Sequence, residues 1–428
     1  MILPALQYRN YRLFFSGQGI SLIGTWMQRI AMSWLVYRLT NSALLLGVVG
    51  FTGQLPIFLL TPFAGVLADR MNRHRVLVAT QTLAMIQALI LALFVFTGTI
   101  AVWHIVTLSI FLGFIDAFDM PVRQSFMVEI VQTKDLGNAI ALNSSIVNSA
   151  QLLGPSIAGI LIASTGEGMC FLLNAISYLF VIVSLLMMKM TSKQIENPKT
   201  PVLKGVGEGF SYVFGFAPIR SILLLLALIS LVGMPFRVLL PVFAKDILHG
   251  GPDTLGFLAG SSGVGALVGS AYLASRRSVL GLGKWIALAS SIFGIGLIAF
   301  SLSHVFWLSM ILILLSSFGM MVQMASSNTI LQTVVDEDKR GRVMSFYAMS
   351  LRGMAPFGSL LAGSLASAIG APNTLIIGGA SCLLGSLMFA RKLPLLREMV
   401  RPIYVRMGIV SEAAPGIQIK KVNRTARR

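Results

Sequence analysis

Charged residues are scarce in this chain of 428 residues. Asp, Glu, Lys and Arg together make up 11% of the sequence, whereas about 25% is usual for a soluble protein. Hydrophobic residues make up 56%. Because so few charges cannot cover a folded domain with a water-facing surface, the composition excludes an ordinary soluble globular protein.

Cysteine and histidine are also rare, with two and four residues respectively. Cys170 and Cys382 stand in apolar segments with unrelated flanks, a pattern that gives neither a disulfide framework nor metal-ligand spacing. The histidines form no cluster that could supply ligands. We therefore expect no metal site and no cofactor, and we interpret both cysteines as small buried hydrophobic residues.

Long apolar runs are what the sequence has instead. A hydrocarbon core about 30 Å thick needs about 20 helical residues to cross it, and in lipid the backbone polar groups must be satisfied within a helix or a closed barrel. The runs lack the alternation that is typical of barrel strands. The sequence therefore predicts an all-α membrane protein with twelve transmembrane helices, near residues 12–37, 44–68, 76–97, 103–128, 138–164, 170–189, 219–246, 254–274, 285–302, 306–332, 343–369 and 374–390.

The formal net charge of the chain is +18. On a soluble protein such an excess would favour nucleic acid as a partner, but its distribution gives another explanation. With the N terminus in the cytoplasm, 28 of the 33 Lys and Arg residues fall in the cytoplasmic loops and tail, and the predicted outer loops carry none. The positive-inside rule then places both termini in the cytoplasm, and no nucleic-acid partner is expected.

The two halves of the sequence resemble each other at an offset of 204 residues. This shift lays three glycines on three others, Gly154, Gly159 and Gly166 on Gly358, Gly363 and Gly370. The match predicts two parallel six-helix halves, 1–190 and 218–393, a cytoplasmic linker with an interfacial helix at 191–217, and a basic cytoplasmic tail at 394–428. Parallel repeats of this size are one way in which secondary transporters are built, although a channel or a membrane enzyme could share them.

The loop between the second and third predicted helices carries a specific motif. Residues 65–75 read Gly-Val-Leu-Ala-Asp-Arg-Met-Asn-Arg-His-Arg, which resembles the signature loop of the major facilitator superfamily. The resemblance implies a cytoplasmic latch, in which the aspartate caps a facing helix and the arginines bind acidic groups on the fourth helix. Asn72 stands where the family usually has glycine, and Ser275 replaces the aspartate in the second half. The latch residues would be Gly65, Asp69, Arg70, Arg73 and Arg123.

The fifth predicted helix contains Gly154, Pro155 and Gly159, which resemble a Gly-Pro motif of the exporter branches of that superfamily. Glycine and proline bend a membrane helix and let a neighbouring helix approach closely. Alanine stands at 150 and 158, where the motif has glycine. Ordinary packing through small residues is therefore the alternative interpretation.

Further segments narrow the resemblance. Residues 10–18, 34–42, 208–212, 240–246, 328–332 and 340–345 are similar to the branch that contains the enterobactin exporter and the macrolide efflux permeases. The resemblance implies a permease of the bacterial plasma membrane and not an enzyme. Such a permease would export a small amphipathic molecule, either a siderophore or a drug-like compound. Export would be coupled to proton antiport, and rocking of the two halves would give alternating access. A lysophospholipid flippase and a proton-coupled uptake symporter are the alternatives. The expected partners are the small-molecule substrate, protons and membrane lipid, and the chain is expected to act as a monomer.

Few charged residues interrupt the predicted helices. A charge at a helix centre costs about 2.5–3.5 kcal/mol on insertion scales, so each is a functional candidate. Asp116 and Asp119, which share one helix face with Arg123, are the candidates for proton coupling. We interpret Asp119 with Arg123 as a salt bridge that serves the latch. Asp116 lies one turn deeper and is either a proton carrier or a structural hydrogen-bonding group.

Arg29, Arg237 and Arg352 are the candidates for cavity charges. Arg29 and Arg237 hold similar places in the two halves, where they would favour an anionic or oxygen-rich cargo or act as counter-charges to the aspartates. Snorkelling of Arg29 to an interface and a structural role for Arg237 between two prolines are the alternatives. An enzyme would need a nucleophile with a base, a metal cluster or paired acids. The one acidic pair in the predicted helices has no histidine near it in sequence, so catalysis is not expected.

Overall fold

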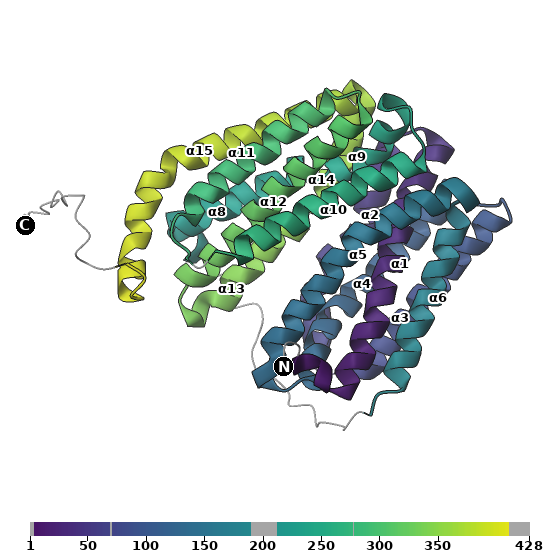
Figure 1. Ribbon diagram of the computed structural model, residues 1–428, viewed down its shortest axis with the longest axis horizontal. Coiled ribbons are helices and arrows are strands. Elements are labelled where there is room, and N and C mark those ends of the chain that lie inside the picture. Colours follow the sequence, from purple (N-terminus) through teal and green to yellow (C-terminus); the bar gives the residue numbers. More distant parts are fainter. Residues whose placement is uncertain (1–3, 69–70, 190–211, 277, 411–428) are drawn as a thin grey trace, which may run out of the picture.

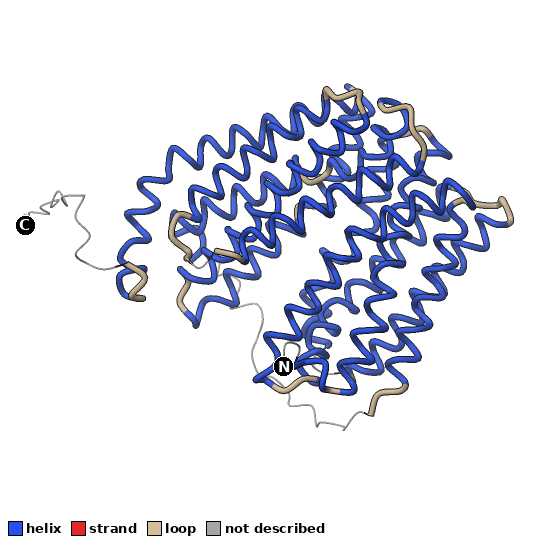
Figure 2. Tube along the Cα trace, viewed as in Figure 1, coloured by secondary structure: helices blue, strands red, loops and turns tan. Residues whose placement is uncertain are grey.

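The computed structural model describes residues 4–68, 71–189, 212–276 and 278–410. Within these ranges all regular structure is helical, and the connecting loops are short (Figure 2). The predicted all-helical fold is confirmed. The longer helices are α1 (Arg9–Thr40), α2 (Ala43–Ala68), α3 (Arg73–Phe96), α4 (Val102–Ile130), α5 (Leu136–Thr165), α6 (Glu167–Leu186), α8 (Ala217–Leu228), α9 (Phe236–Val242), α10 (Pro252–Ala274), α11 (Leu282–Ser301), α12 (Phe306–Val334), α13 (Glu337–Ala348), α14 (Ala355–Ile369) and α15 (Ala371–Arg406).

Ten helical spans in the described ranges are long and apolar enough to cross a membrane. The two other predicted crossings fall on α1 and on the pair α13 and α14. α1 has sufficient length, but Gln18, Gln28 and Arg29 interrupt its apolar sequence. The predicted crossing at 343–369 is divided between two shorter helices. The number twelve therefore stays a prediction.

Two of the crossings are interrupted by π-helical turns. After α8 the chain forms such a turn, η3 (Ile229–Gly233), then α9, then a second, η4 (Phe243–Ile247). Another, η5 (Met349–Gly353), separates α13 from α14. Proline removes a backbone donor and disturbs the preceding turn, and Pro235, Pro241 and Pro356 stand beside these interruptions. Single π turns inside helices occur often at functional sites, and here they flank Arg237 and contain Arg352.

The helices form two bundles, one of α1–α6 and one of α8–α15 (Figure 1). α5 packs along α10 and α2 along α14, and these two helix pairs carry most of the contact between the bundles. In Figure 1 the bundles meet at the upper right and their ribbons diverge toward the lower edge, where the N terminus lies. We call the side on which α1 begins the inner side, which the distribution of Lys and Arg predicts to be cytoplasmic.

Equivalent glycines of the two repeats occupy equivalent places. Gly166 ends α5 and Gly370 ends α14, and both have a φ of +85°, which favours glycine. A Cβ on Gly159 would lie 2.9 Å from the Cα of Gly256 in α10, and one on Gly363 would lie 2.7 Å from the Cα of Gly47 in α2. Each repeat therefore uses its glycine to bring one helix against the other half.

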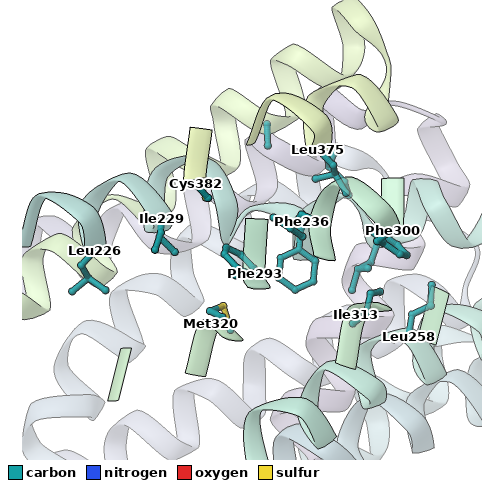
Figure 3. Packing of buried hydrophobic residues seen from close by; sticks show 14 of the residues in the cluster. Leu226, Ile229, Phe236, Leu258, Phe293, Phe300, Ile313, Met320, Leu375 and Cys382 are labelled. Atoms are coloured by element: carbon teal, nitrogen blue, oxygen red, sulfur yellow. The ribbon is translucent and has the colours of Figure 1, made fainter. Parts of the chain in front are cut away.

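Aromatic packing stabilises the interrupted helix α9 in the C-terminal bundle (Figure 3). Phe236 is fully buried, and its ring lies 6.2 Å from that of Phe293. Cys382 is buried in the same cluster and, like Cys170, is a free thiol. Because helices in lipid associate mainly through close packing, this cluster fixes the backbone that carries the next residue, Arg237.

The C-terminal helix is longer than the sequence predicts. The twelfth crossing was expected to end at 390, but α15 continues to Arg406 and contains 36 residues, about 54 Å of helix. Arg391 and Lys392 end the apolar run without ending the helix, so the predicted basic tail begins as helix. The predicted interfacial helix falls largely on residues 190–211, which lie outside the described ranges.

Candidate substrate and coupling site

Asp116 lies halfway along α4, and Arg29 of α1 faces it. Nη2 of Arg29 is 4.0 Å from Oδ2 of Asp116, and the two side chains are 46% and 28% exposed. The Arg29 guanidinium also lies 4.9 Å from the centre of the Trp26 ring, in a cation–π contact. Arg29 is thus directed toward the acidic residue of α4, and both groups remain accessible.

Arg237 brings a second positive charge from the other bundle. It lies in α9 directly after the buried Phe236, whose ring centre is 5.9 Å from the guanidinium. Within the described ranges no carboxylate lies at salt-bridge distance from Arg237. Arg237 therefore adds a positive charge from the C-terminal bundle that has no counter-ion in the described ranges.

Arg352 supplies a third guanidinium, from the π-helical turn η5. Its Nη1 donates to Sδ of Met120 at 3.5 Å, and Met120 directly follows Asp119 in α4. The contact joins the two bundles. Because a thioether is a weak acceptor and Arg352 is exposed, most of its donors remain available for another group.

We take these four side chains, which come from both bundles, as a candidate mixed-charge site. Asp116 is its one carboxylate with weak pairing, and three arginines accompany it. Arginine binds carboxylate and other oxygen-rich groups through several N–H donors, whereas an ionised carboxylate accepts hydrogen bonds from hydroxyl or amine donors. The arrangement suits a small molecule that carries both kinds of group.

Asp119 has very different surroundings from Asp116. It is 1% exposed, and its Oδ1 accepts hydrogen bonds from Thr80 and Gln81 of α3, each at 2.8 Å. Arg123 donates to Oδ2 and, through Nη1, to Oε1 of Gln18 at 2.9 Å. This buried network joins α4 to α1 and α3. Both members of this ion pair make further hydrogen bonds, although Nε of Arg123 is buried without a partner among the described residues.

The predicted latch is only partly within the described ranges. Arg73, at the start of α3, donates to Oε1 of Glu129 near the end of α4 at 2.5 Å, and Arg123 is engaged with Asp119. Asn72 caps α3, because its side chain accepts from the backbone N–H of Arg75 at 3.1 Å. Gly65 falls in α2, and Asp69 and Arg70 lie outside the description. The latch itself stays a prediction.

The Gly-Pro motif of α5 lies between α1 and α10. A Cβ on Gly154 would be 2.5 Å from Cβ of Trp26 in α1, and Gly159 faces Gly256 of α10. Pro155, between them in sequence, is buried. Trp26 can approach α5 this closely only because residue 154 is glycine, and its ring also makes the cation–π contact with Arg29. The motif therefore supports the position of Arg29 as well as the contact between the halves.

A polar contact on the outer side was missing from the predicted site. Tyr37 of α1 donates to the carboxylate of Asp246 in η4, and Lys245 donates to Oδ1 of Asn41 at 2.6 Å. The Lys245 Nζ also lies 5.6 Å from the Tyr37 ring. These residues come from segments 34–42 and 240–246, which the sequence marks by resemblance. A resemblance in sequence does not show that these two segments lie in contact in the folded protein.

Metal ligation has no support in the described ranges. No group of three or more His, Cys, Asp or Glu side chains in them could hold an ion. The charged side chains of the candidate site are one aspartate and three arginines, a set that does not suit a divalent cation.

Comparison with known proteins also indicates a membrane transporter. The family described as transmembrane secretion effector matches residues 3–402. The staphyloferrin A transporter of Staphylococcus aureus is 27% identical over 394 residues, which cover 90% of this chain and 98% of that protein. The multidrug efflux pump Tap of Mycolicibacterium fortuitum is 26% identical over 407 residues, which cover 90% and 94%.

A solved structure supports the fold. A bacterial homologue of the human lysosomal transporter Spinster, in an inward-facing and unoccupied conformation, has a TM-score of 0.67 and 15% identity, and the match covers 93% of this chain and 98% of that one. At this identity the likeness shows the fold alone. The predicted fold class and the resemblance to major facilitator exporters are confirmed, and the chain is an integral protein of a bacterial membrane.

Proposed function

Because the chain belongs to the transmembrane secretion effector family of the major facilitator superfamily, we propose that it exports a small amphipathic molecule from the cytoplasm as a secondary transporter. Its relatives support this proposal, since one is a staphyloferrin A transporter and another is a multidrug efflux pump. The proposed location is the plasma membrane with both termini in the cytoplasm, and the proposed active unit is the monomer.

The observation that carries the proposal is the candidate set of charged side chains Arg29, Asp116, Arg237 and Arg352, in which Arg29 faces Asp116 and Arg352 contacts Met120 of the same helix. Its members come from both bundles, as a binding site for alternating access requires. Three guanidinium groups favour an anionic or oxygen-rich part of the cargo. A site lined only by apolar side chains would fit a lipid flippase better, so the charges favour a polar, siderophore-like cargo.

Proton exchange follows if Asp116 itself binds the cargo. A cargo hydroxyl or amine that donates to Asp116 needs the ionised carboxylate, so cargo and proton compete for the same oxygen atoms. Cargo binding from the cytoplasm then releases a proton, and a proton from outside displaces the cargo. Asp116 suits this role better than Asp119, because it is 28% exposed and its ion pair is long at 4.0 Å.

Asp119 and Arg123 are proposed to hold α4 in place for this exchange. All the hydrogen bonds of Asp119 lead to residues of α3 or to Arg123, which leaves it no free side toward a cargo. With Arg73 and Glu129 it would connect the site to the predicted latch on the inner side.

The proposal is tested by measuring proton release from purified protein as ligands are added. The panel consists of staphyloferrin A, a macrolide, a cationic dye and a lysophospholipid, and the variants are Asp116→Asn and, as a matched control, Glu398→Gln on the exposed part of α15. We expect one ligand class to release protons from the wild type and from the control, and none to do so from Asp116→Asn.

Other outcomes would separate the alternatives. Proton uptake on binding would indicate a symporter and contradict antiport through Asp116. Binding of the lysophospholipid without any proton exchange would favour a flippase. Arg29→Gln, Arg237→Gln and Arg352→Gln should each weaken binding of an anionic cargo about 10-fold or more, because a hydrogen bond to a charged group contributes about 1.5–3 kcal/mol. Unchanged affinity in all three would remove the proposed role of the arginines.

A further inference from the structure

A second site lies at the inner end of the C-terminal bundle. A pocket of about 410 Å³ is lined by the first turns of α8, the loop before α11 and its first turn, the end of α12 and the last part of α15. None of the candidate transport residues lines it. Its volume is within the range of about 300–1,000 Å³ that is usual for small-ligand sites.

α15 gives this pocket its chemistry. The residues of α15 that line it recur at the spacing of one helical face, at 389, 393, 396, 397, 400, 401 and 404. Phe389, Leu396 and Val400 are buried and apolar. Arg397 and Arg401 lie on the same face, one turn apart, with Val400 between them and Tyr404 beyond them. The lining from 389 to 396 is therefore apolar, and both basic residues lie closer to the inner side.

The two arginines have no counter-ion in the described ranges. No carboxylate there lies at salt-bridge distance from Arg397 or Arg401. Glu398 is their neighbour in sequence, but it does not line the pocket. By contrast, Arg406 pairs with Asp336 at 3.1 Å, which ties the end of α15 to the loop between α12 and α13. The pocket thus presents two uncompensated positive charges beside an apolar wall.

The opposite wall has a defined shape. Nη2 of Arg276 donates to the carbonyl of Leu280 at 3.2 Å, and Gly281 turns the loop with a φ of +81°. At Gly283 a Cβ would lie 2.8 Å from Cδ1 of Leu393, so glycine lets the first turn of α11 touch α15. This wall of the pocket therefore packs directly against the Leu393 side chain.

We propose that this pocket binds an anionic phospholipid of the inner leaflet. Its acyl chain would lie against the apolar wall around Phe389, and its phosphate would lie between Arg397 and Arg401. Phe389 and Arg397 are eight positions apart, about 12 Å along the helix, and the order from apolar to basic is the order of a lipid in that leaflet. Basic pockets between membrane helices bind lipid head groups in this way.

Charge also argues against the main alternative occupant, the C-terminal segment of this chain. Residues 411–428 contain five Lys or Arg and one Glu. Their net charge has the same sign as Arg397 and Arg401, so the segment would be repelled by the basic end of the pocket. A phosphate group is complementary to it.

The test uses the full-length protein purified in a maltoside detergent. Lipid affinity is measured by native mass spectrometry and by the rise in unfolding temperature on adding phosphatidylglycerol, phosphatidylcholine with the same chains, or inorganic phosphate. We compare Arg397→Gln/Arg401→Gln with Arg391→Gln/Lys392→Gln, which removes the same charge from exposed positions of α15 outside the pocket. The first pair should weaken phosphatidylglycerol binding roughly 30-fold, from two arginines near a membrane surface, and the second should leave it unchanged.

A second variant keeps the charges and fills the space. Ile222→Trp should weaken binding of both lipids, because Ile222 lines the apolar wall. Equal losses in the two charge variants would overturn the proposal, since they would indicate diffuse surface attraction. It would also be overturned if phosphatidylcholine bound equally well, if inorganic phosphate alone reproduced the stabilisation, or if the effect appeared only after removal of residues 411–428.

Discussion

At the scale of single residues, α4 carries two carboxylates one turn apart that have different surroundings. Asp119 is buried and accepts three hydrogen bonds, whereas Asp116 is partly exposed and has one long ion pair. The two carboxylates therefore differ in role, Asp119 as structural support and Asp116 as the candidate for transport. We expect substitutions at these two positions to separate stability from transport.

Asp119→Asn should lower the stability of the protein strongly. The substitution keeps the shape of the side chain but leaves the positive charge of Arg123 in the bundle interior without its partner. Removing one member of a buried ion pair costs about 3–5 kcal/mol. Thermal unfolding of the purified protein in detergent should show a clearly lower midpoint.

Two further variants serve as controls for this prediction. Asp116→Asn should change the unfolding midpoint little, because its ion pair is exposed and long. Asp119→Asn/Arg123→Gln should recover part of the loss, since neither charge is then unpaired. If Asp119→Asn unfolds at the wild-type temperature, the network is not the structural support inferred here.

Sequence reasoning could find the charged members of the site and not their partners. Charge is rare in an apolar helix, which makes the charged members recognisable: Arg29, Asp116, Arg237 and Arg352. Tyr37 gives no such signal, and its partner Asp246 is more than two hundred residues away in the chain. Pairings at that separation depend on how the two bundles dock, which no local pattern contains.

At the scale of helices, the two contacts between the bundles depend on glycine. Gly159→Ala should disfavour the observed arrangement, because its Cβ would lie 2.7 Å from the carbonyl oxygen of Pro252 and 2.9 Å from Cα of Gly256. Overpacking of this kind costs about 1–3 kcal/mol. The penalty applies only while the outer ends of α5 and α10 touch, so the equilibrium should shift toward an outward-open state.

Distances between spin labels at Thr99→Cys and His304→Cys, in outer loops of the two bundles, would report this shift. Gly154→Ala is the matched control, because its Cβ would clash with Trp26 inside the same bundle. It should lower stability without widening the outer distance. Equal distance distributions for Gly159→Ala and the wild type would show that the glycine contact does not control the equilibrium.

Helix positions were predictable and helix interruptions were not. The predicted crossing at 44–68 and α2 (Ala43–Ala68) differ by one residue, because hydropathy marks where a chain enters and leaves lipid. The π-helical turns around Arg237 and at Arg352 depend on packing between helices. The continuation of α15 to Arg406 was missed for a related reason, since leaving the membrane does not end a helix.

At the scale of the whole molecule, several close contacts between the bundles lie toward the outer side. The outer parts of the helices carry the glycine contacts of Gly47 with Gly363 and of Gly159 with Gly256. They also carry the polar contacts of Tyr37 and Lys245. On the inner side the ribbons diverge (Figure 1). Bundles that touch closely toward one side are expected of one end state in alternating access.

Tyr37→Phe should therefore favour opening on the outer side. The tyrosine hydroxyl donates across the bundle interface to Asp246, and phenylalanine keeps the ring while removing that bond. Asp246 is exposed, so we expect a cost of about 1 kcal/mol, or roughly a fivefold shift in the conformational equilibrium. The same pair of spin labels in the outer loops would measure the change.

The neighbouring residue offers a control that distinguishes a gate from a general weakening. Arg38 pairs with Glu167 at 2.7 Å, but both residues belong to the N-terminal bundle, so Arg38→Gln removes an ionic contact of the same region without touching the interface. It should leave the outer distance unchanged. If Arg38→Gln and Tyr37→Phe widen that distance equally, opening depends on the stability of the outer end of α1, and the Tyr37–Asp246 contact has no special part in it.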